Sequence, residues 1–250
     1  MSVKLDNVIA TRATKTVHRD GHLCIKLFNE GYSVADVLNE AHNLAIVEET
    51  GFRVPKLVNV QKIKNRWAIV TEFIEGKTLA QLMADDPKAA DACLERFVDL
   101  HLEMHAYSAE KLRHLTDKMH AYIDMSGLDT TAVYELHTRL ASLPRHSKLC
   151  HGDFCPSNII VAPSGEAYVI DWAHATRGNA SADTARSYLL FRMAGENDRA
   201  ERYLDLFCGK SGTARQYVQK WMAIVAAARL VKGDPEERDF LQSWAHVVEY

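Results

Sequence analysis

Asp153, Asn158 and Asp171 are the residues whose types and spacing best indicate chemistry in this chain. Asp153 and Asn158 lie five residues apart in the stretch 150–158, which reads CHGDFCPSN, and Asp171 follows in an Ile-Asp-Trp triplet. An amide oxygen and a carboxylate suit Mg²⁺, a hard ion that takes few protein ligands and leaves room for substrate phosphates. The remaining carboxylate, on Asp153, is then free to accept a proton from an incoming hydroxyl. The combination indicates phosphate-transfer chemistry.

A predicted β-hairpin must bring two of these residues together. Two apolar runs, 159–161 and 167–170, are separated by the turn-type segment APSGE at 162–166. A hairpin joins its strands at one end and leaves the other end open. Asn158 and Asp171 flank the open end, so we expect their side chains to lie near one another.

The pattern His-Gly-Asp-x-x-x-x-Asn followed by Ile-Asp-Trp resembles the catalytic core of the eukaryotic-like kinase superfamily, and especially its aminoglycoside phosphotransferase and choline kinase branch. The resemblance implies an α+β, protein-kinase-like two-lobed fold, with an antiparallel sheet and one helix in the N-terminal lobe and a mainly helical C-terminal lobe. It divides the chain into a nucleotide-binding lobe, 1–75, and a catalytic and acceptor-binding lobe, 76–250. Gly152 stands where protein kinases carry an arginine that holds a phosphorylated loop, so regulation by loop phosphorylation is not implied.

The same resemblance assigns roles to individual residues. Asp153 is the expected catalytic residue, which orients or deprotonates the acceptor hydroxyl, and Asn158 and Asp171 are the expected Mg²⁺ ligands. His151 is expected to brace the loop through hydrogen bonds. Asp183 matches an acid that hydrogen-bonds the catalytic loop in the family, and the alternative is an ordinary acid favoured at a helix N-terminus.

The first third of the chain offers a lysine and a glutamate for the nucleotide. Lys26 lies in the apolar run 23–28, and burying its ammonium requires a counter-charge. Glu40 lies on a predicted helix over 33–50, which opens with Ser-x-x-Asp and ends at Gly51. The resemblance assigns Lys26 to the α- and β-phosphates of ATP and Glu40 to the ion pair that orients it. The alternative is a lysine at the surface of an edge strand, with a solvated glutamate.

Two further apolar runs, 54–63 and 67–74, complete a predicted five-stranded antiparallel sheet. The resemblance places the adenine hinge at the end of the second run, where the Glu72 carbonyl and the Ile74 amide hydrogen-bond adenine. The expected position of the family's glycine-rich phosphate loop, 9–16, contains no glycine. Hydroxyls and backbone amides of that segment are then the candidates for capping phosphates.

Beyond residue 76, apolar periodicity predicts helices at 87–107, 109–125, 130–143, 180–194, 198–207, 211–231 and from 235 onward. Gly209 and Gly233 are the predicted stops of two of them. With 47% hydrophobic residues, the chain can bury a substantial core.

Composition excludes some classes of partner. The net charge of −3 and the lack of a basic run argue against nucleic acid. Five cysteines without a Cys-x-x-Cys pair indicate reduced thiols and predict a cytoplasmic location. No apolar run is long enough to cross a bilayer, and the N-terminus lacks the apolar core of a signal peptide, so no membrane association is expected. The oligomeric state stays open.

Histidines and tryptophans each have a functional and a structural interpretation. His101 and His105, at helical spacing, match metal ligands but have no third ligand nearby in the sequence. Trp172, Trp221 and Trp244 either form an aromatic cage for a quaternary ammonium or belong to the core, which we favour.

The sequence thus predicts an ATP- and Mg²⁺-dependent phosphotransferase that moves the γ-phosphoryl group to a hydroxyl of a small molecule. An aminoglycoside acceptor is favoured by the resemblance alone, and the acidic stretches 196–205 and 234–239 either receive such a polycation or are solvated helix ends. A basic pocket beside Asp153, lined by Arg177 and Arg186, would instead indicate an anionic acceptor. A nucleotide-binding pseudokinase or regulatory module, motivated by the missing glycines, and a metal hydrolase are the alternatives.

Overall fold

The structure, a computed structural model, describes residues 3–231 and 235–246. The chain forms two compact units, each of which is discontinuous in sequence. Unit 1 contains Met1–Ala90 and Pro156–His174, and unit 2 contains Asp91–Cys155 and Ala175–Tyr250. The functional division into lobes at 1–75 and 76–250 stays a prediction.

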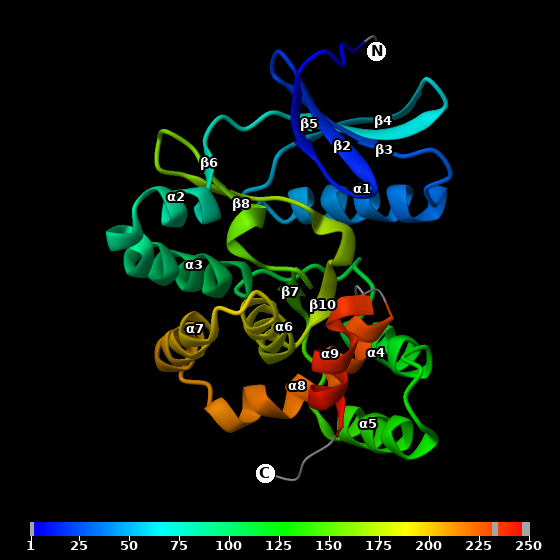
Figure 1. The fold of residues 1–250 in the computed structure, drawn as a ribbon, viewed down its shortest axis with the longest axis vertical. Helices are drawn as coiled ribbons and strands as arrows, with labels where there is room; N and C mark the ends of the chain where they lie inside the picture. The colour runs from blue at the N-terminus through cyan, green and yellow to red at the C-terminus, as the bar shows by residue number, and fades with distance from the viewer. Residues whose placement is uncertain (1–2, 232–234, 247–250) are drawn as a thin grey trace. The chain divides into compact units, whose positions relative to one another are not determined.

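Unit 1 is built on a five-stranded sheet with the strand order β1-β2-β3-β5-β4 (Figure 1). Its neighbouring strands all pair antiparallel. The strands are β1 (Val8–Thr11), β2 (Lys15–Asp20), β3 (Leu23–Phe28), β4 (Leu57–Ile63) and β5 (Arg66–Glu72). The predicted five-stranded antiparallel sheet is confirmed.

Helix α1 (Val34–Glu49) packs against this sheet (Figure 1). The hydroxyl of Ser33 caps its N-terminus by accepting a hydrogen bond from the Asp36 amide at 3.2 Å. Gly51 follows its C-terminus with a φ of +81°, a left-handed conformation that favours glycine. Both predicted ends of the helix are confirmed.

Strand β3 alternates its side chains between the two faces of the sheet. Leu23, Ile25 and Leu27 belong to a buried cluster on one face. Phe28 belongs to the cluster on the other face, together with residues of α1. Lys26 lies two residues before Phe28, so its side chain projects from the α1 face.

A second, three-stranded sheet of unit 1 contains the predicted hairpin. Strand β8 (Ile159–Val161) pairs antiparallel with β9 (Ala167–Val169) and with β6 (Lys77–Thr78). Gly76, which precedes β6, has a φ of +147°, and a Cβ there would overlap the carbonyl oxygen of Val161. Only glycine fits this close approach of two backbones. Helix α2 (Leu79–Asp85) follows β6 and was not predicted.

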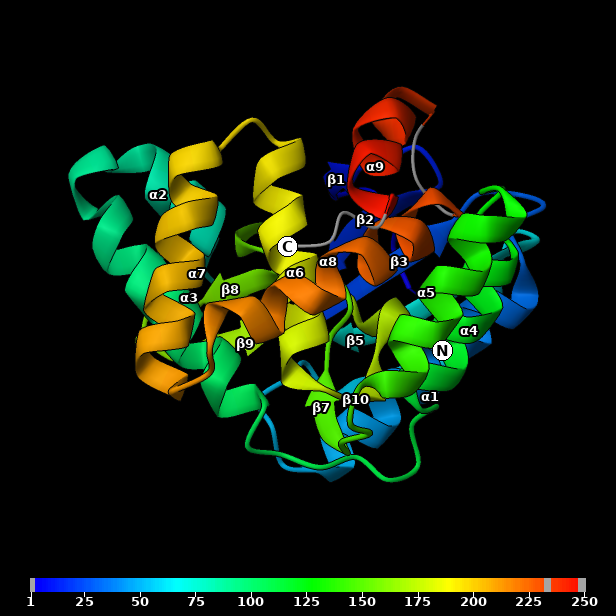
Figure 2. The same ribbon diagram turned by 90° about the horizontal axis from the view of Figure 1, so that it is seen from below.

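Unit 2 is mainly helical. Its helix α6 packs against α7 and α8, and α8 packs against α9 (Figure 2). The helices are α3 (Ala90–Met104), α4 (Leu115–Asp124), α5 (Thr130–Ser142), α6 (Ala180–Met193), α7 (Asn197–Ser211), α8 (Arg215–Leu230) and α9 (Arg238–Ala245). Two short strands, β7 (Lys148–Cys150) and β10 (Thr176–Gly178), pair antiparallel beside them.

The predicted helix boundaries at 109, 209 and 211 are wrong, the last because α7 still includes Ser211 and α8 begins only at Arg215. The segment 109–114 is not helical, because its carbonyls bond to a strand distant in sequence: those of Leu112 and Arg113 accept from Nε and N of Arg177, at 3.2 and 3.1 Å. Gly209 does not end a helix, since α7 continues past it to a left-handed Gly212 with a φ of +69°. The other predicted stop, at residue 233, lies outside the described residues.

Among the helices of residues 3–231 and 235–246, none combines the length and apolar character that crossing a bilayer requires. All five cysteines are free thiols.

Candidate active site

Lys26 lies at the centre of a buried ionic cluster in unit 1. Its Nζ contacts the Glu40 carboxylate and lies 3.0 Å from Oδ1 of Asp171. Strand β3 is an inner strand, between β2 and β5, and the Lys26 side chain is only 17% exposed. The predicted Lys26–Glu40 ion pair is confirmed, and a lysine at the surface of an edge strand is excluded.

Burial and ion pairing act in opposite directions on the pKa values of this cluster. Burial alone would lower the pKa of Lys26, but the charges of Asp171 and Glu40 outweigh it and raise that pKa. Burial alone would raise the pKa of Asp171, but Lys26 and Lys15 outweigh it and lower that pKa. Lysine and aspartate are therefore both charged at neutral pH.

Lys15 supplies a second cation to Asp171. It begins β2, directly after the glycine-free turn that follows β1, and its Nζ lies 3.0 Å from Oδ2 of Asp171. Sequence reasoning counted Lys15 only within the phosphate-capping segment and did not foresee this partner. The feature of the sequence that could have indicated this contact is a lysine in the segment 9–16, where the family's phosphate loop is rich in glycine.

The backbone around Asp171 is tightly held. Asp171 itself has a φ of +68°, a conformation that aspartate tolerates better than most residues. The buried amide of Asn43, on α1, donates to the carbonyl of Trp172 at 3.1 Å. The Trp172 indole donates to the carbonyl of Val169 at 3.0 Å. Asn43 was missed by sequence reasoning, although a polar residue three positions after Glu40 shares its helix face.

Asn158 and Asp171 flank the open end of the β8–β9 hairpin, as predicted. The Ile170 amide donates to the Asn158 carbonyl at 2.9 Å and closes the ladder there. The Asp171 carboxylate is the point on which two ammonium groups converge, and the Asn158 amide oxygen beside it stays a predicted ligand. Oxygen donors in a place that attracts positive charge fit Mg²⁺.

The predicted hinge follows strand β5. Glu72 is the last residue of β5. The backbone amide of the following residue, Phe73, donates a hydrogen bond to the carbonyl of His22 at 2.8 Å. The guanidinium of Arg19 lies over the Phe73 ring, 4.1 Å from its centroid. These contacts hold the segment that ends at Ile74, whose role toward adenine stays a prediction.

In unit 2, Asp183 holds the loop that carries Asp153. Its Oδ2 accepts from the His151 amide at 2.8 Å, and its Oδ1 accepts from the Gly152 amide at 2.7 Å. Gly152 has a φ of +79°, which favours glycine at this sharp turn. Asp183 is 1% exposed, so it is not a solvated acid at the start of α6. The predicted support of the loop is confirmed.

Two buried histidines of α3 and its C-terminal end complete this support. The Nε2 atoms of His101 and His105 lie 3.2 and 3.3 Å from Oδ2 of Asp183, and Nδ1 of His101 contacts the Tyr203 hydroxyl at 2.9 Å. The fold thus places Asp183 beside the two histidines, as the third group that is absent from their neighbourhood in the sequence. Burial lowers the pKa of His101 to about 3. Burial would raise the pKa of Asp183, but hydrogen bonds from both histidines outweigh it and lower that pKa. We interpret the cluster as a bracing network, because the ring nitrogens that face Asp183 are engaged in these hydrogen bonds.

Asp153 follows the braced turn. Its amide donates to Nδ1 of His151 at 3.1 Å, which confirms the predicted bracing role of that histidine. Its side chain is 30% exposed. Nη2 of Arg186 lies 3.0 Å from Oδ1 of Asp153, and Nη1 of Arg229 lies 4.0 Å from the same oxygen.

Only one of the two arginines named as markers of a basic pocket contacts Asp153. Arg186 does, whereas Arg177 pairs with Glu110 at 2.8 Å. The second arginine near Asp153 is Arg229, on α8, which sequence reasoning missed. Nothing in the local sequence of α8 links it to Asp153.

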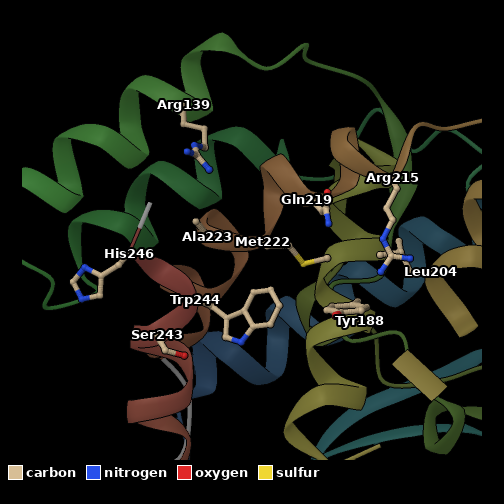
Figure 3. A pocket seen from close by; sticks show the side chains of 10 residues that line it. All are labelled: Arg139, Tyr188, Leu204, Arg215, Gln219, Met222, Ala223, Ser243, Trp244 and His246. Carbon is tan, nitrogen blue, oxygen red and sulfur yellow. The ribbon is translucent and has the colours of Figure 1, made fainter. Parts of the chain in front are cut away.

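A hollow of about 270 Å³ opens in unit 2 among α5, α6, α7 and α8 and the Trp244 end of α9 (Figure 3). Trp244 projects into it beside Tyr188, and its lining also includes Arg139, Leu204, Arg215, Gln219, Met222, Ala223, Ser243 and His246.

Trp172 and Trp221 are each 1% exposed, which confirms their core placement. A cage of all three tryptophans is excluded because two of the rings are inaccessible to a ligand.

Unit 1 holds Lys26 in ion pairs with Glu40 and Asp171, and unit 2 holds the loop of Asp153 through Asp183. These features are those of a kinase-like phosphotransferase. Residues 9–221 match the model of the Phosphotransferase enzyme family. The chain therefore belongs to that family.

Solved structures share the predicted fold. Aminoglycoside-3'-phosphotransferase of type VIII is 19% identical, with a TM-score of 0.64 over 92% of each chain. A thermostable mutant of aminoglycoside phosphotransferase APH(4)-Ia, in a ternary complex with AMP-PNP and hygromycin B, is 14% identical, with a TM-score of 0.69 over 94% of this chain and 90% of that chain. Choline kinase LicA from Streptococcus pneumoniae is 16% identical, with a TM-score of 0.60 over 97% and 91%. No curated protein matches the sequence.

Proposed function

We propose that this protein transfers the γ-phosphoryl group of ATP to a hydroxyl of a small molecule, with the help of Mg²⁺. The observation that carries the proposal is the buried cluster in which Glu40 and Asp171 hold Lys26. Withdrawing such charges largely from water is unfavourable unless they are paired and hydrogen-bonded, and a pseudokinase has no need of them. Membership of the phosphotransferase family and the AMP-PNP complex of APH(4)-Ia support ATP as the donor.

Unit 1 binds the nucleotide in this proposal. Lys26 contacts the α- and β-phosphates, and Glu40 fixes the direction of its side chain. Lys15 contributes a further positive charge in place of a glycine-rich loop. The Glu72 carbonyl and the Ile74 amide hydrogen-bond adenine.

Asn158 and Asp171 would hold Mg²⁺ through their side-chain oxygens. When bound, the ion would supply positive charge to the phosphates and to the charge that develops during transfer. The lysines that now contact Asp171 would then be available to phosphate oxygens.

Asp153 orients the acceptor hydroxyl and accepts its proton. The hydroxyl oxygen forms a bond to the γ-phosphorus, the bond between that phosphorus and the β,γ-bridging oxygen breaks, and ADP leaves with the electron pair. Asp183, with its histidines, keeps the backbone of the loop in place for this step.

Two variants test these roles. Asp153→Asn should keep its affinity for Mg-ATP, measured by titration calorimetry, and lose about 10³-fold in acceptor-dependent ADP release, because it cannot accept the proton. Asp171→Ala should lose Mg²⁺-dependent nucleotide binding. Asp117→Asn, which changes an exposed acid paired with Arg145, is the control and should change neither. A folded wild-type protein that binds no nucleotide would defeat the proposal.

Measuring ATP consumption with and without acceptors separates the alternatives. A kinase consumes ATP faster when its acceptor is present. A pseudokinase consumes none, and a metal hydrolase cleaves other phosphoesters as well.

A further inference from the structure

We propose that the acceptor carries an oxyanion, a carboxylate or a phosphate, and that Arg186 and Arg229 bind it beside Asp153. This inference rests on the proposed function and specifies the class of acceptor.

Arg186 is a buried guanidinium whose hydrogen-bonding capacity is only partly used. Its Nη2 donates to Asp153 at 3.0 Å and its Nε to the Gly152 carbonyl at 3.3 Å. Its Nη1 is buried and has no hydrogen-bond partner within the described chain, although the residue is only 9% exposed. A buried charged donor without an acceptor is unfavourable. An oxyanion would supply the missing acceptor, and the planar guanidinium suits such a group.

Arg229 adds a second positive charge at the same place. Its Nε and Nη2 each donate to one oxygen of Glu237 at 2.8 Å. The remaining Nη1 is the atom that lies 4.0 Å from Asp153. The two guanidiniums, which both approach Oδ1 of Asp153, carry like charges, and burial followed by the charge of Arg229 lowers the pKa of Arg186 to about 10. An anion bound to both would relieve the repulsion between these like charges.

Several of the acidic side chains that could receive a polycation are already paired with arginines. On α7, Glu196 pairs with Arg199 at 2.6 Å, and Asp205 pairs with Arg215 of α8. Asp234 lies outside the described residues. None of the side chains that line the hollow of unit 2 is acidic. An aminoglycoside would need several unpaired carboxylates around Asp153, whereas two arginines reach it.

Alcohols that share one ring and differ in charge provide the direct test. ADP release from Mg-ATP by the full chain should be measured with glucuronate, glucose 6-phosphate, glucose and glucosamine, and with a polycationic aminoglycoside. We expect kcat/KM to be at least about tenfold higher for an anionic member than for glucose, and lowest for the cations. The carboxylate and phosphate arms distinguish the two sources of the oxyanion. The highest kcat/KM with glucosamine or the aminoglycoside would overturn the inference.

Arginine variants test the site itself. Arg229→Gln should raise the KM of the anionic acceptor about tenfold, with a smaller change in kcat. Arg186→Lys should keep the charge but lose the fork of donors, and should retain part of the affinity that Arg186→Gln loses. The matched control is Lys220→Gln, which removes an exposed positive charge of the same helix outside the hollow and should leave the KM unchanged. An unchanged KM in Arg229→Gln would contradict the assignment even if the Arg186 variants did not fold.

Anion binding without nucleotide separates this inference from the proposed function. Inorganic phosphate and glucuronate should bind the nucleotide-free protein in calorimetry, and at least about tenfold more weakly in Arg229→Gln. If Mg-ATP does not bind but this anion binding holds, the kinase proposal fails and the anion site stands. If Mg-ATP is turned over but anion binding is absent or independent of Arg229, the kinase proposal stands and the anion site is wrong.

Discussion

Single residues of this protein are arranged so that each buried charge of the ionic cluster meets an opposite one. Lys26 contacts Glu40 and Asp171, and Asp171 contacts Lys15 as well. Removing one partner of such a group leaves an uncompensated charge, which is worse than exchanging both partners for apolar groups. The cluster is therefore both a nucleotide-binding device in our proposal and a point of sensitivity for the fold.

Glu40→Gln should lower the free energy of unfolding by about 3 kcal/mol, because Lys26 loses one of its two counter-charges in a buried place. Urea denaturation measures the change. Glu75→Gln, which removes the partner of Arg19 in a more exposed ion pair, is the control and should change stability by less than about 0.5 kcal/mol. Equal effects of the two variants would show that burial of the Lys26 cluster has no special weight.

His101 makes stability depend on pH. Its pKa is about 3 in the folded protein, against an ordinary value of 6.5, so the unfolded chain binds its proton first. Its stabilising contribution is complete above pH 6.5 and is lost progressively as pH falls toward 3.

The lowered pKa of Asp183 adds a further loss below its usual value of 3.8. Urea titrations between pH 7 and pH 4 should show a smaller slope for His101→Gln than for the wild type. The same slope in both proteins would rule out His101 as a source of acid sensitivity.

Secondary-structure elements set the directions of the functional side chains. The period of β3 places Lys26 on the face covered by α1, and the β8–β9 hairpin places Asn158 and Asp171 at one open end. Gly76 allows β6 to approach β8 closely enough to pair with it. Strands β6, β8 and β9 are short, so the turn residues that flank them contribute strongly to whether they form.

Gly76→Ala should lower the free energy of unfolding by about 3 kcal/mol, because the φ of +147° and the overlap with Val161 both oppose a side chain. Gly21→Ala is the matched control. Gly21 also has a positive φ, of +58°, but no atom lies within 4 Å of the position that a Cβ would take there, so we expect a loss of about 1 kcal/mol. Urea denaturation compares the two variants, and a smaller loss for Gly76→Ala would contradict the close approach.

Noncovalent contacts alone stabilise each of the two units, because the protein has no disulfide among its five cysteines. All five cysteines are free thiols, and Cys150 is fully buried, where burial raises its pKa well above the usual value. A buried thiol with a raised pKa is unreactive. A cytoplasmic location, which these thiols favour, stays a prediction.

The thermal unfolding midpoint of freshly purified protein should be the same with and without a reducing agent, because no disulfide restricts the unfolded chain. Differential scanning calorimetry at two concentrations of dithiothreitol measures this. A midpoint that falls with the reducing agent would reveal a stabilising disulfide and would remove the support for a reducing compartment.

The sequence by itself determined the features that depend on neighbours along the chain. The apolar run 23–28 and the helical period over 33–50 predicted the strand of Lys26 and the helix of Glu40, and the structure contains both elements with an ion pair between the two residues. The turn at 162–166 predicted the hairpin whose open end is flanked by Asn158 and Asp171. In each case the physical reason is that strand, helix and turn periods are written in consecutive residues.

Tertiary structure alone decided the contacts between residues distant in the chain. Lys15 and Asp171 are 156 residues apart, and Asp183 meets His101 across 82 residues. Arg229 reaches Asp153 from a helix whose local sequence gives no sign of that neighbour. Such partners are chosen by packing and by the pairing of buried charges, which no local period encodes. For the same reason the segment 109–114 exchanges helical hydrogen bonds for bonds to a distant strand.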